Sequence, residues 1–211
     1  MNFVRKTIKD AAVGVGVADD PSGLRAFLQP GCAAAIWRRT LPIHLRSWLE
    51  NLPEDHFPTG RVTLSRDDVA KTVRRFCDRS GLPNGNERAW FEADITKMAG
   101  LIADLMKAQY LRLRLDKVQT NACRKFHVDA ITGRLVCTYR GPGTQYGVSP
   151  DGADPKRVFT VPTGAPILLR GSLWPANPPS GLLHRSPPIE GTGETRLVLV
   201  LDPLLDLEEA E

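Results

Sequence analysis

Two histidines, an aspartate and an arginine form the pattern of this sequence that is most directly tied to chemistry. His127 and Asp129 are separated by a single residue, and His184 and then Arg196 follow much later in the chain. Because residues i and i+2 of a strand project to the same face, His127 and Asp129 can reach one metal ion together. Two histidines and a carboxylate form a facial triad, which suits Fe(II) and leaves metal positions open for further ligands. The pattern therefore predicts a metal site formed by His127, Asp129 and His184.

Arg196 stands at the start of an apolar, strand-like run shortly after the second histidine. A guanidinium group offers a planar fork of donors that pairs with a carboxylate through two parallel hydrogen bonds. An arginine at this place would suit a dicarboxylate cosubstrate that also reaches the metal. It could equally be a surface residue that opens a strand.

A hairpin estimate adds two residues to the expected pocket. If Asp129 faces Arg134 across a short turn, then Thr138 and Arg140 lie on the same face of the sheet as His127. We therefore expect Thr138 and Arg140 to line the cosubstrate pocket. Cys123 shares the parity of His127 and either approaches the pocket or is a small buried thiol.

Length and composition bound the class of protein. The chain has 211 residues, of which 42% are hydrophobic and 25% charged, with a formal net charge of +4. These values are typical of one globular domain with a sizeable core. No apolar run approaches the roughly 18 residues of a membrane span, and the N-terminus lacks the apolar region of a signal peptide. The four cysteines lack C-x-x-C spacing, so we expect free thiols and a cytoplasmic protein without a membrane partner.

The first half of the chain predicts helices, and the second half predicts strands. Helices are expected at 20–28, 41–52, 66–79 and 87–109, the last two from apolar residues at helical spacing. At Tyr110 the period changes to two, which indicates a half-buried strand over 111–118. Further strands are expected at 121–128, 134–140, 157–161, 166–170, 181–185 and 195–202.

Short strands at this spacing favour an antiparallel sandwich or jelly roll. The predicted fold class is α+β, with a helical N-terminal layer (1–109) packed on a β-rich metal-binding core (110–205). Residues 206–211 are expected to form an acidic tail, and the whole to be one compact domain.

Residues 110–202 also resemble a known superfamily. The stretch PILLRGSLWPANPPSGLLHRSPPIEGTGETRLVLVLD is similar to the end of the double-stranded β-helix core of Fe(II)/2-oxoglutarate-dependent oxygenases. There, an apolar strand leads to the histidine, a Pro/Gly turn, and an arginine that opens the last strand. CRKFHVDAITGRLVCTYRGPGTQY is similar to a bacterial family of unknown function found near zinc-homeostasis genes.

The oxygenase resemblance implies a role for each residue of the pattern. His127, Asp129 and His184 would hold Fe(II), and Arg196 would bind the distal carboxylate of 2-oxoglutarate. The protein would then be a hydroxylase or demethylase. The helical first half is not diagnostic of such an enzyme, and no second residue for 2-oxoglutarate stands out.

Two other functions remain open on the sequence. The same three ligands suit Zn(II) in a non-redox, cupin-like protein that handles zinc, and a sandwich of this kind could also bind a partner without chemistry. Arginines near the expected pocket point to an anionic substrate. Whether that substrate is a metabolite, a protein or a nucleic acid is left open.

Overall fold

The computed structural model describes residues 11–121 and 123–206. The first ten residues and the acidic end from residue 207 lie outside this range, so the predicted tail at 206–211 is not tested. Within it, the chain combines helices with two β-sheets, which confirms the mixed character expected from the sequence.

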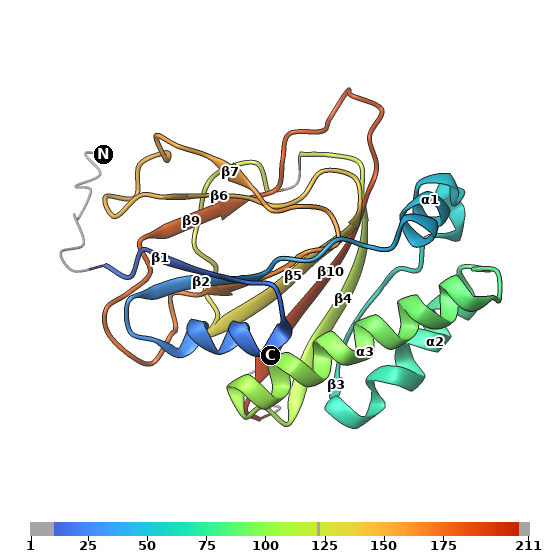
Figure 1. The fold of residues 1–211 in the computed structure, drawn as a ribbon, viewed down its shortest axis with the longest axis horizontal. Helices are drawn as coiled ribbons and strands as arrows, with labels where there is room; N and C mark the ends of the chain where they lie inside the picture. Colours follow the sequence, from blue (N-terminus) through green and yellow to red (C-terminus); the bar gives the residue numbers. More distant parts are fainter. Residues whose placement is uncertain (1–10, 122, 207–211) are drawn as a thin grey trace.

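Seven strands form the larger sheet, and three form the smaller one (Figure 1). The larger sheet has the order β1 (Gly14–Ala18), β2 (Cys32–Trp37), β8 (Pro166–Arg170), β5 (Gly133–Arg140), β10 (Arg196–Leu204), β4 (Tyr110–Val118) and β3 (Gly60–Ser65). The smaller sheet has the order β7 (Phe159–Thr160), β6 (Gln145–Val148) and β9 (Leu182–Arg185). All strand pairs are antiparallel except β1 and β2, which are parallel.

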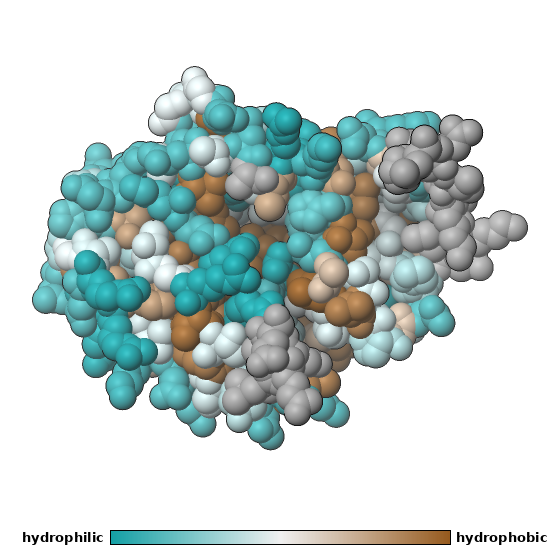
Figure 2. Space-filling view, turned by 180° about the vertical axis from the view of Figure 1, so that it is seen from behind, coloured by the Kyte–Doolittle hydropathy of each residue, from teal (hydrophilic) through white to brown (hydrophobic). Residues whose placement is uncertain are grey.

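Helices cover the side of the larger sheet that faces away from the smaller sheet (Figure 1). The α-helices are α1 (Ile43–Asn51), α2 (Val69–Arg79) and α3 (Asn86–Met106), and short 3-10 turns lie at Pro21–Leu28, Glu54–His56 and Arg66–Asp68. None of the helices in the described ranges is long and apolar enough to cross a membrane. Figure 2 shows hydrophilic residues over much of one face, with hydrophobic residues visible between them.

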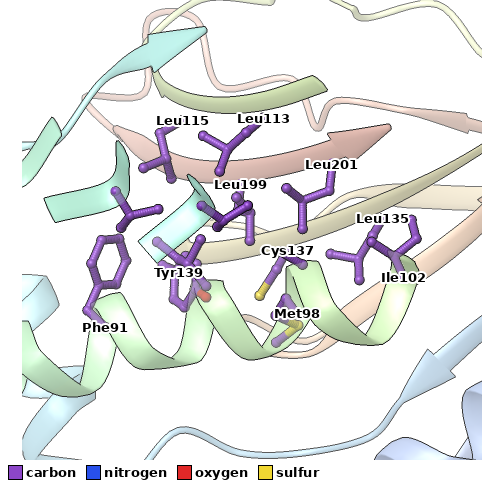
Figure 3. Close-up of a cluster of buried hydrophobic side chains, with 14 of the residues drawn as sticks. Phe91, Met98, Ile102, Leu113, Leu115, Leu135, Cys137, Tyr139, Leu199 and Leu201 are labelled. Atoms are coloured by element: carbon purple, nitrogen blue, oxygen red, sulfur yellow. The ribbon is translucent and has the colours of Figure 1, made fainter. Parts of the chain in front are cut away.

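Strand alternation divides the larger sheet into an apolar face and a face that carries the polar residues. Leu111, Leu113 and Leu115 of β4 are fully buried toward the helices, whereas Arg114 and Asp116 lie on the opposite face. Figure 3 shows this helix-side core, in which α3 contributes Phe91, Met98 and Ile102 and the strands contribute Leu113, Leu115, Leu135, Cys137, Tyr139, Leu199 and Leu201. A second apolar cluster fills the space between the two sheets and includes Val136, Ile167, Leu182, Val198 and Val200.

The first half of the chain differs from the expected helical layer. Helices α2 and α3 lie close to the predicted ranges 66–79 and 87–109, but β1, β2 and β3 are part of the larger sheet. All six residues of β2 are buried, because the strand is covered on both faces. Such a strand shows no alternation of apolar and polar residues, so its sequence, CAAAIW, gives no period-two signal.

The estimated hairpin between 121–128 and 134–140 is wrong. Strand β5 pairs with β8 and β10, and the described residues 121 and 123–128 form no strand apart from an isolated bridge between His127 and His184. The segment before β5 therefore does not pair with β5. At His127 it lies against β9 of the smaller sheet instead.

Candidate metal centre

Backbone pairing brings the two histidines together from distant parts of the chain. The backbone amide of His127 donates to the carbonyl of His184, and the amide of His184 donates to the carbonyl of His127, each with a donor–acceptor distance of 3.0 Å. Their imidazole rings lie 4.6 Å apart between centroids. His184 is held on β9 of the smaller sheet, while Asp129 lies in the turn that enters β5 of the larger sheet. The three side chains thus meet where the two sheets approach each other.

The ligand atoms of His127, Asp129 and His184 all lie within 4.8 Å of one another. The Nε2 atom of His184 is 3.0 Å from Oδ2 of Asp129, and Nε2 of His127 is 3.5 Å from Oδ1. The Nδ1 atom of His127 lies 2.8 Å from the carbonyl of Lys125. A hydrogen bond there fixes the tautomer that keeps the Nε2 lone pair available to a metal. The donor set and its spacing therefore fit one divalent metal ion.

Burial and charge set the protonation of the three groups. Desolvation of the buried His184 lowers its pKa, which favours the neutral imidazole that metals bind. The hydrogen bond to Asp129 raises the pKa of His127. Burial opposes ionisation of Asp129, but its hydrogen bonds with both histidines and the charge of Arg134 outweigh burial and hold its pKa well below the usual range. The Asp129 carboxylate is therefore anionic at neutral pH and can serve as a metal ligand.

Arg134 also contacts this centre. From the sequence it was expected only to face Asp129 across a hairpin, and no role at the metal site was predicted for it. Its Nη1 donates to Oδ2 of Asp129 over 2.7 Å, while Nε and Nη2 bind the two carboxylate oxygens of Asp202 at 2.6 and 2.8 Å. Asp202 is buried on β10. The predicted proximity of Asp129 and Arg134 thus holds for the side chains, although the strand pairing behind it does not.

Arg196 lies in the same pocket as the three ligands. It is only 2% exposed, and among the described residues no carboxylate forms an ion pair with it. Its guanidinium donates to the carbonyl of Pro142 (2.7 Å), to Oγ of Ser186 (3.2 Å) and to Oγ1 of Thr138 (3.1 Å). Desolvation lowers the pKa of Arg196 to about 10, so the side chain is still a cation at neutral pH.

Thr138 and Arg140 have different surroundings. Thr138 accepts a hydrogen bond from Arg196, but it does not line the pocket itself. Arg140 instead donates to the carbonyls of Leu49 and Leu52 near the end of α1 and is not part of the pocket wall. Leu197 pairs with Arg140 and Val198 with Thr138, so one extra residue of β5 forms a bulge that reverses the alternation. The expectation for Arg140 is therefore wrong.

The pocket around the centre has a volume of about 370 Å³. Its floor includes Val136, Val198 and Val200, and its charged wall includes Arg114, Asp116 and Arg185. Cys123 lies at its edge and is exposed. Sequence reasoning missed Arg114, although the alternation of β4 fixes its face once the helix side is known.

Solved structures with this fold include dioxygenases. Dioxygenase for auxin oxidation 1 from Arabidopsis thaliana, in a binary complex with 2-oxoglutarate, is 11% identical, with a TM-score of 0.56 over 93% of this chain and 94% of that chain. The dioxygenase for auxin oxidation in rice is 15% identical, with a TM-score of 0.52 over 91% of this chain and 83% of that chain. These likenesses show a shared fold.

Comparison by sequence gives a family without a known activity. Among curated protein sequences, none matches this chain. One family model matches residues 18–202, which include all the residues of the centre and the strands of both sheets apart from most of β1 and the end of β10. The chain belongs to that family, which is described as protein of unknown function (DUF1826).

Proposed function

We propose that the protein is an Fe(II)- and 2-oxoglutarate-dependent oxygenase with a double-stranded β-helix core, acting as a hydroxylase or demethylase. The observation that carries the proposal is Arg196, a buried cation without a carboxylate partner in the described chain, in one pocket with two histidines and an aspartate. A buried charge is costly unless it is paired. A dicarboxylate that also reaches the metal would supply the missing partner.

Each residue then has a defined task. His127, Asp129 and His184 would hold Fe(II), and Arg196 would bind the distal carboxylate of 2-oxoglutarate. When bound, Fe(II) and 2-oxoglutarate would supply the chemistry with dioxygen as the oxidant: one oxygen atom is used in the oxidative decarboxylation of the cosubstrate to succinate and CO2, and the other in oxidation of a substrate C–H bond.

The surrounding side chains orient the guanidinium and exclude water. Ser186 and Thr138 accept from two different nitrogens of Arg196, which fixes the plane of its fork. Val198 and Val200 form an apolar floor beside it, and an ion pair is stronger where water is excluded. The same fold in dioxygenases, one of them solved with 2-oxoglutarate, supports this assignment.

The test is an anaerobic titration of the metal-free protein with Fe(II) and then with 2-oxoglutarate, followed by visible absorption. We expect a metal-to-ligand charge-transfer band that appears only with both components and is lost in His127→Ala. Binding of Fe(II) or Zn(II) without the band would support instead the cupin-like zinc protein, since Zn(II) accepts the same ligands. Absence of metal binding would contradict both.

Two substitutions separate the metal from the cosubstrate. His184→Ala removes a ligand, and we expect it to abolish tight metal binding. Arg196→Ala leaves the ligands in place, so metal affinity should persist while 2-oxoglutarate affinity falls about 10- to 100-fold, the loss of a charge-assisted pair. Calorimetry on both variants measures this, and unchanged 2-oxoglutarate affinity in Arg196→Ala would refute the role of Arg196.

A further inference from the structure

The face of β4 and β3 next to the metal pocket carries arginines that the proposed function does not use. Alternation places Arg114 and Asp116 of β4 on this face, where Arg114 and Asp116 also line the pocket. Their side chains are 31% and 38% exposed. Strand β3 is the edge strand of the larger sheet, and the exposed fractions of the two side chains show that solvent or a ligand can reach them.

Arg114 is incompletely satisfied among the described residues. Its Nε lies 2.9 Å from Oδ2 of Asp116, yet the N–H does not point at that oxygen, and the buried Nε atom has no hydrogen-bond partner. An ion pair at this exposure contributes little. The buried Nε is out of a ligand's reach, so an oxyanion would meet the Nη groups of this partly exposed guanidinium.

Arg61 increases the positive charge at the same place. It lies on β3 directly opposite Arg114 in the antiparallel register, is exposed, and has no ion pair with a carboxylate in the described chain. Like charges directly opposite each other on a sheet destabilise it. An anion bound between the two guanidinium groups would remove that repulsion.

The charge of the pocket points the same way. Four arginines line it, namely Arg114, Arg134, Arg185 and Arg196, whereas its carboxylates are Asp116 and Asp129, with Asp202 behind Arg134. Fe(II) and the 2-oxoglutarate dianion carry equal and opposite charges, so binding of both leaves the net charge of the pocket unchanged. The net positive charge that remains favours an anionic substrate.

We propose that Arg61 and Arg114 bind an oxyanion of the substrate, a carboxylate or a phosphate, beside the metal pocket. This inference rests on the proposed function, which makes the pocket an oxygenase site. Strands in a sheet are about 4.8 Å apart, so β4 lies about 10 Å from β5, the strand that follows Asp129. The anchored group would therefore be separated from the oxidised carbon by several bonds.

The experiment is calorimetric titration of the protein at low ionic strength with two probes, inorganic phosphate and butyrate. The variants are Arg61→Gln/Arg114→Gln, a matched double Arg25→Gln/Arg75→Gln that removes the same charge from exposed positions elsewhere, and Arg196→Gln. We expect the first double variant to weaken binding of at least one probe about tenfold or more, with little change in the matched double variant. Arg196→Gln reports any part of the binding that occurs in the cosubstrate site. The tighter probe identifies the oxyanion.

Three results would overturn the proposal. Equal weakening in both double variants would mean general charge attraction, loss confined to Arg196→Gln would place the anion in the cosubstrate site, and no binding of either probe would leave no anion site. Arg114→Lys keeps the charge but not the fork, so intermediate binding there supports the proposal even if the double variant folds poorly. If the titration with Fe(II) and 2-oxoglutarate gave no charge-transfer band while the probes still bound, the proposed function would be wrong and the anion site would stand.

Discussion

At Asp129 one carboxylate is shared between two histidines and an arginine. Oδ1 faces His127, whereas Oδ2 faces both His184 and Arg134. A hydrogen bond to the oxygen that does not bind the metal is a common way to fix a carboxylate ligand, and loss of such a partner typically lowers metal affinity 10- to 100-fold. Arg134 is thus suited to position Asp129, and through Asp202 it ties this turn to β10.

Replacement of Arg134 by methionine tests that connection. The change leaves the buried carboxylate of Asp202 without its bidentate partner, so we expect the free energy of unfolding of the metal-free protein to fall by about 3 kcal/mol. Metal affinity should fall about tenfold or more. Urea unfolding and metal titration measure the two effects, with Arg134→Lys as the control that retains charge. A stable variant with unchanged metal affinity would show that Arg134 does not position Asp129.

Thiol reactivity should single out one cysteine. Cys32, Cys77 and Cys137 are buried, whereas Cys123 is exposed at the pocket edge. Burial raises the pKa of Cys77 and of Cys137 to about 12, and the thiolate is the reactive form. At pH 8 we expect a thiol reagent to modify Cys123 first, as peptide mapping would show, with Cys123→Ser abolishing the fast phase. Early modification of Cys137 would contradict the packing of α3 on the sheet.

Among the elements, those with one buried and one polar face could be predicted from sequence. Helices α2 and α3 and strand β4 carry strong periodic patterns because each packs one face on the helix-side core. Strand β2 is buried on both faces, and β1, GVGVA, is rich in glycine, so neither produces a strand signal. Local spacing likewise predicted the grouping of His127 with Asp129. The bulge that turns Arg140 away depends on pairing with β10, which no local pattern reveals.

A buried ionic network fastens α3 to the larger sheet. Asp94 of α3 accepts two hydrogen bonds from Arg39, at 2.6 and 2.7 Å, and one from the hydroxyl of Tyr139 at 2.7 Å. The side chain of Asp94 is 5% exposed and that of Arg39 12%. The helix is thereby tied to β5 and to the segment after β2, on the face opposite the metal pocket.

We expect the loss in the free energy of unfolding to depend on which residue of this network is replaced. Asp94→Ala leaves Arg39 as a buried cation without its carboxylate, which should lower the free energy of unfolding by about 3–5 kcal/mol. Tyr139→Phe removes a single hydrogen bond to a charged group and should cost about 2 kcal/mol. Urea unfolding compares them. A smaller cost for Asp94→Ala than for Tyr139→Phe would contradict the network as described.

On the scale of the whole molecule, the candidate metal centre bridges two sheets that have separate strand orders. His184 comes from the smaller sheet, and Asp129 precedes the central strand β5 of the larger one. His127 belongs to neither sheet and joins β9 only through its bridge to His184. In the metal-free protein the contact between the two sheets is therefore weak here, because residues 121 and 123–128 have no strand ladder of their own.

Metal binding should consequently stabilise the entire fold and protect the contact between His127 and His184. A ligand at 100 times its Kd adds about 2.7 kcal/mol, which for a chain of this size corresponds to a rise in Tm of about 5–10 °C. We expect that rise with Zn(II), its reversal by a chelator, and slower amide exchange at His127 and His184. Under His184→Ala the rise should vanish, because one ligand is gone. A rise that survives His184→Ala would mean that the metal binds elsewhere, and the centre would then be only a hydrogen-bonded contact between the sheets.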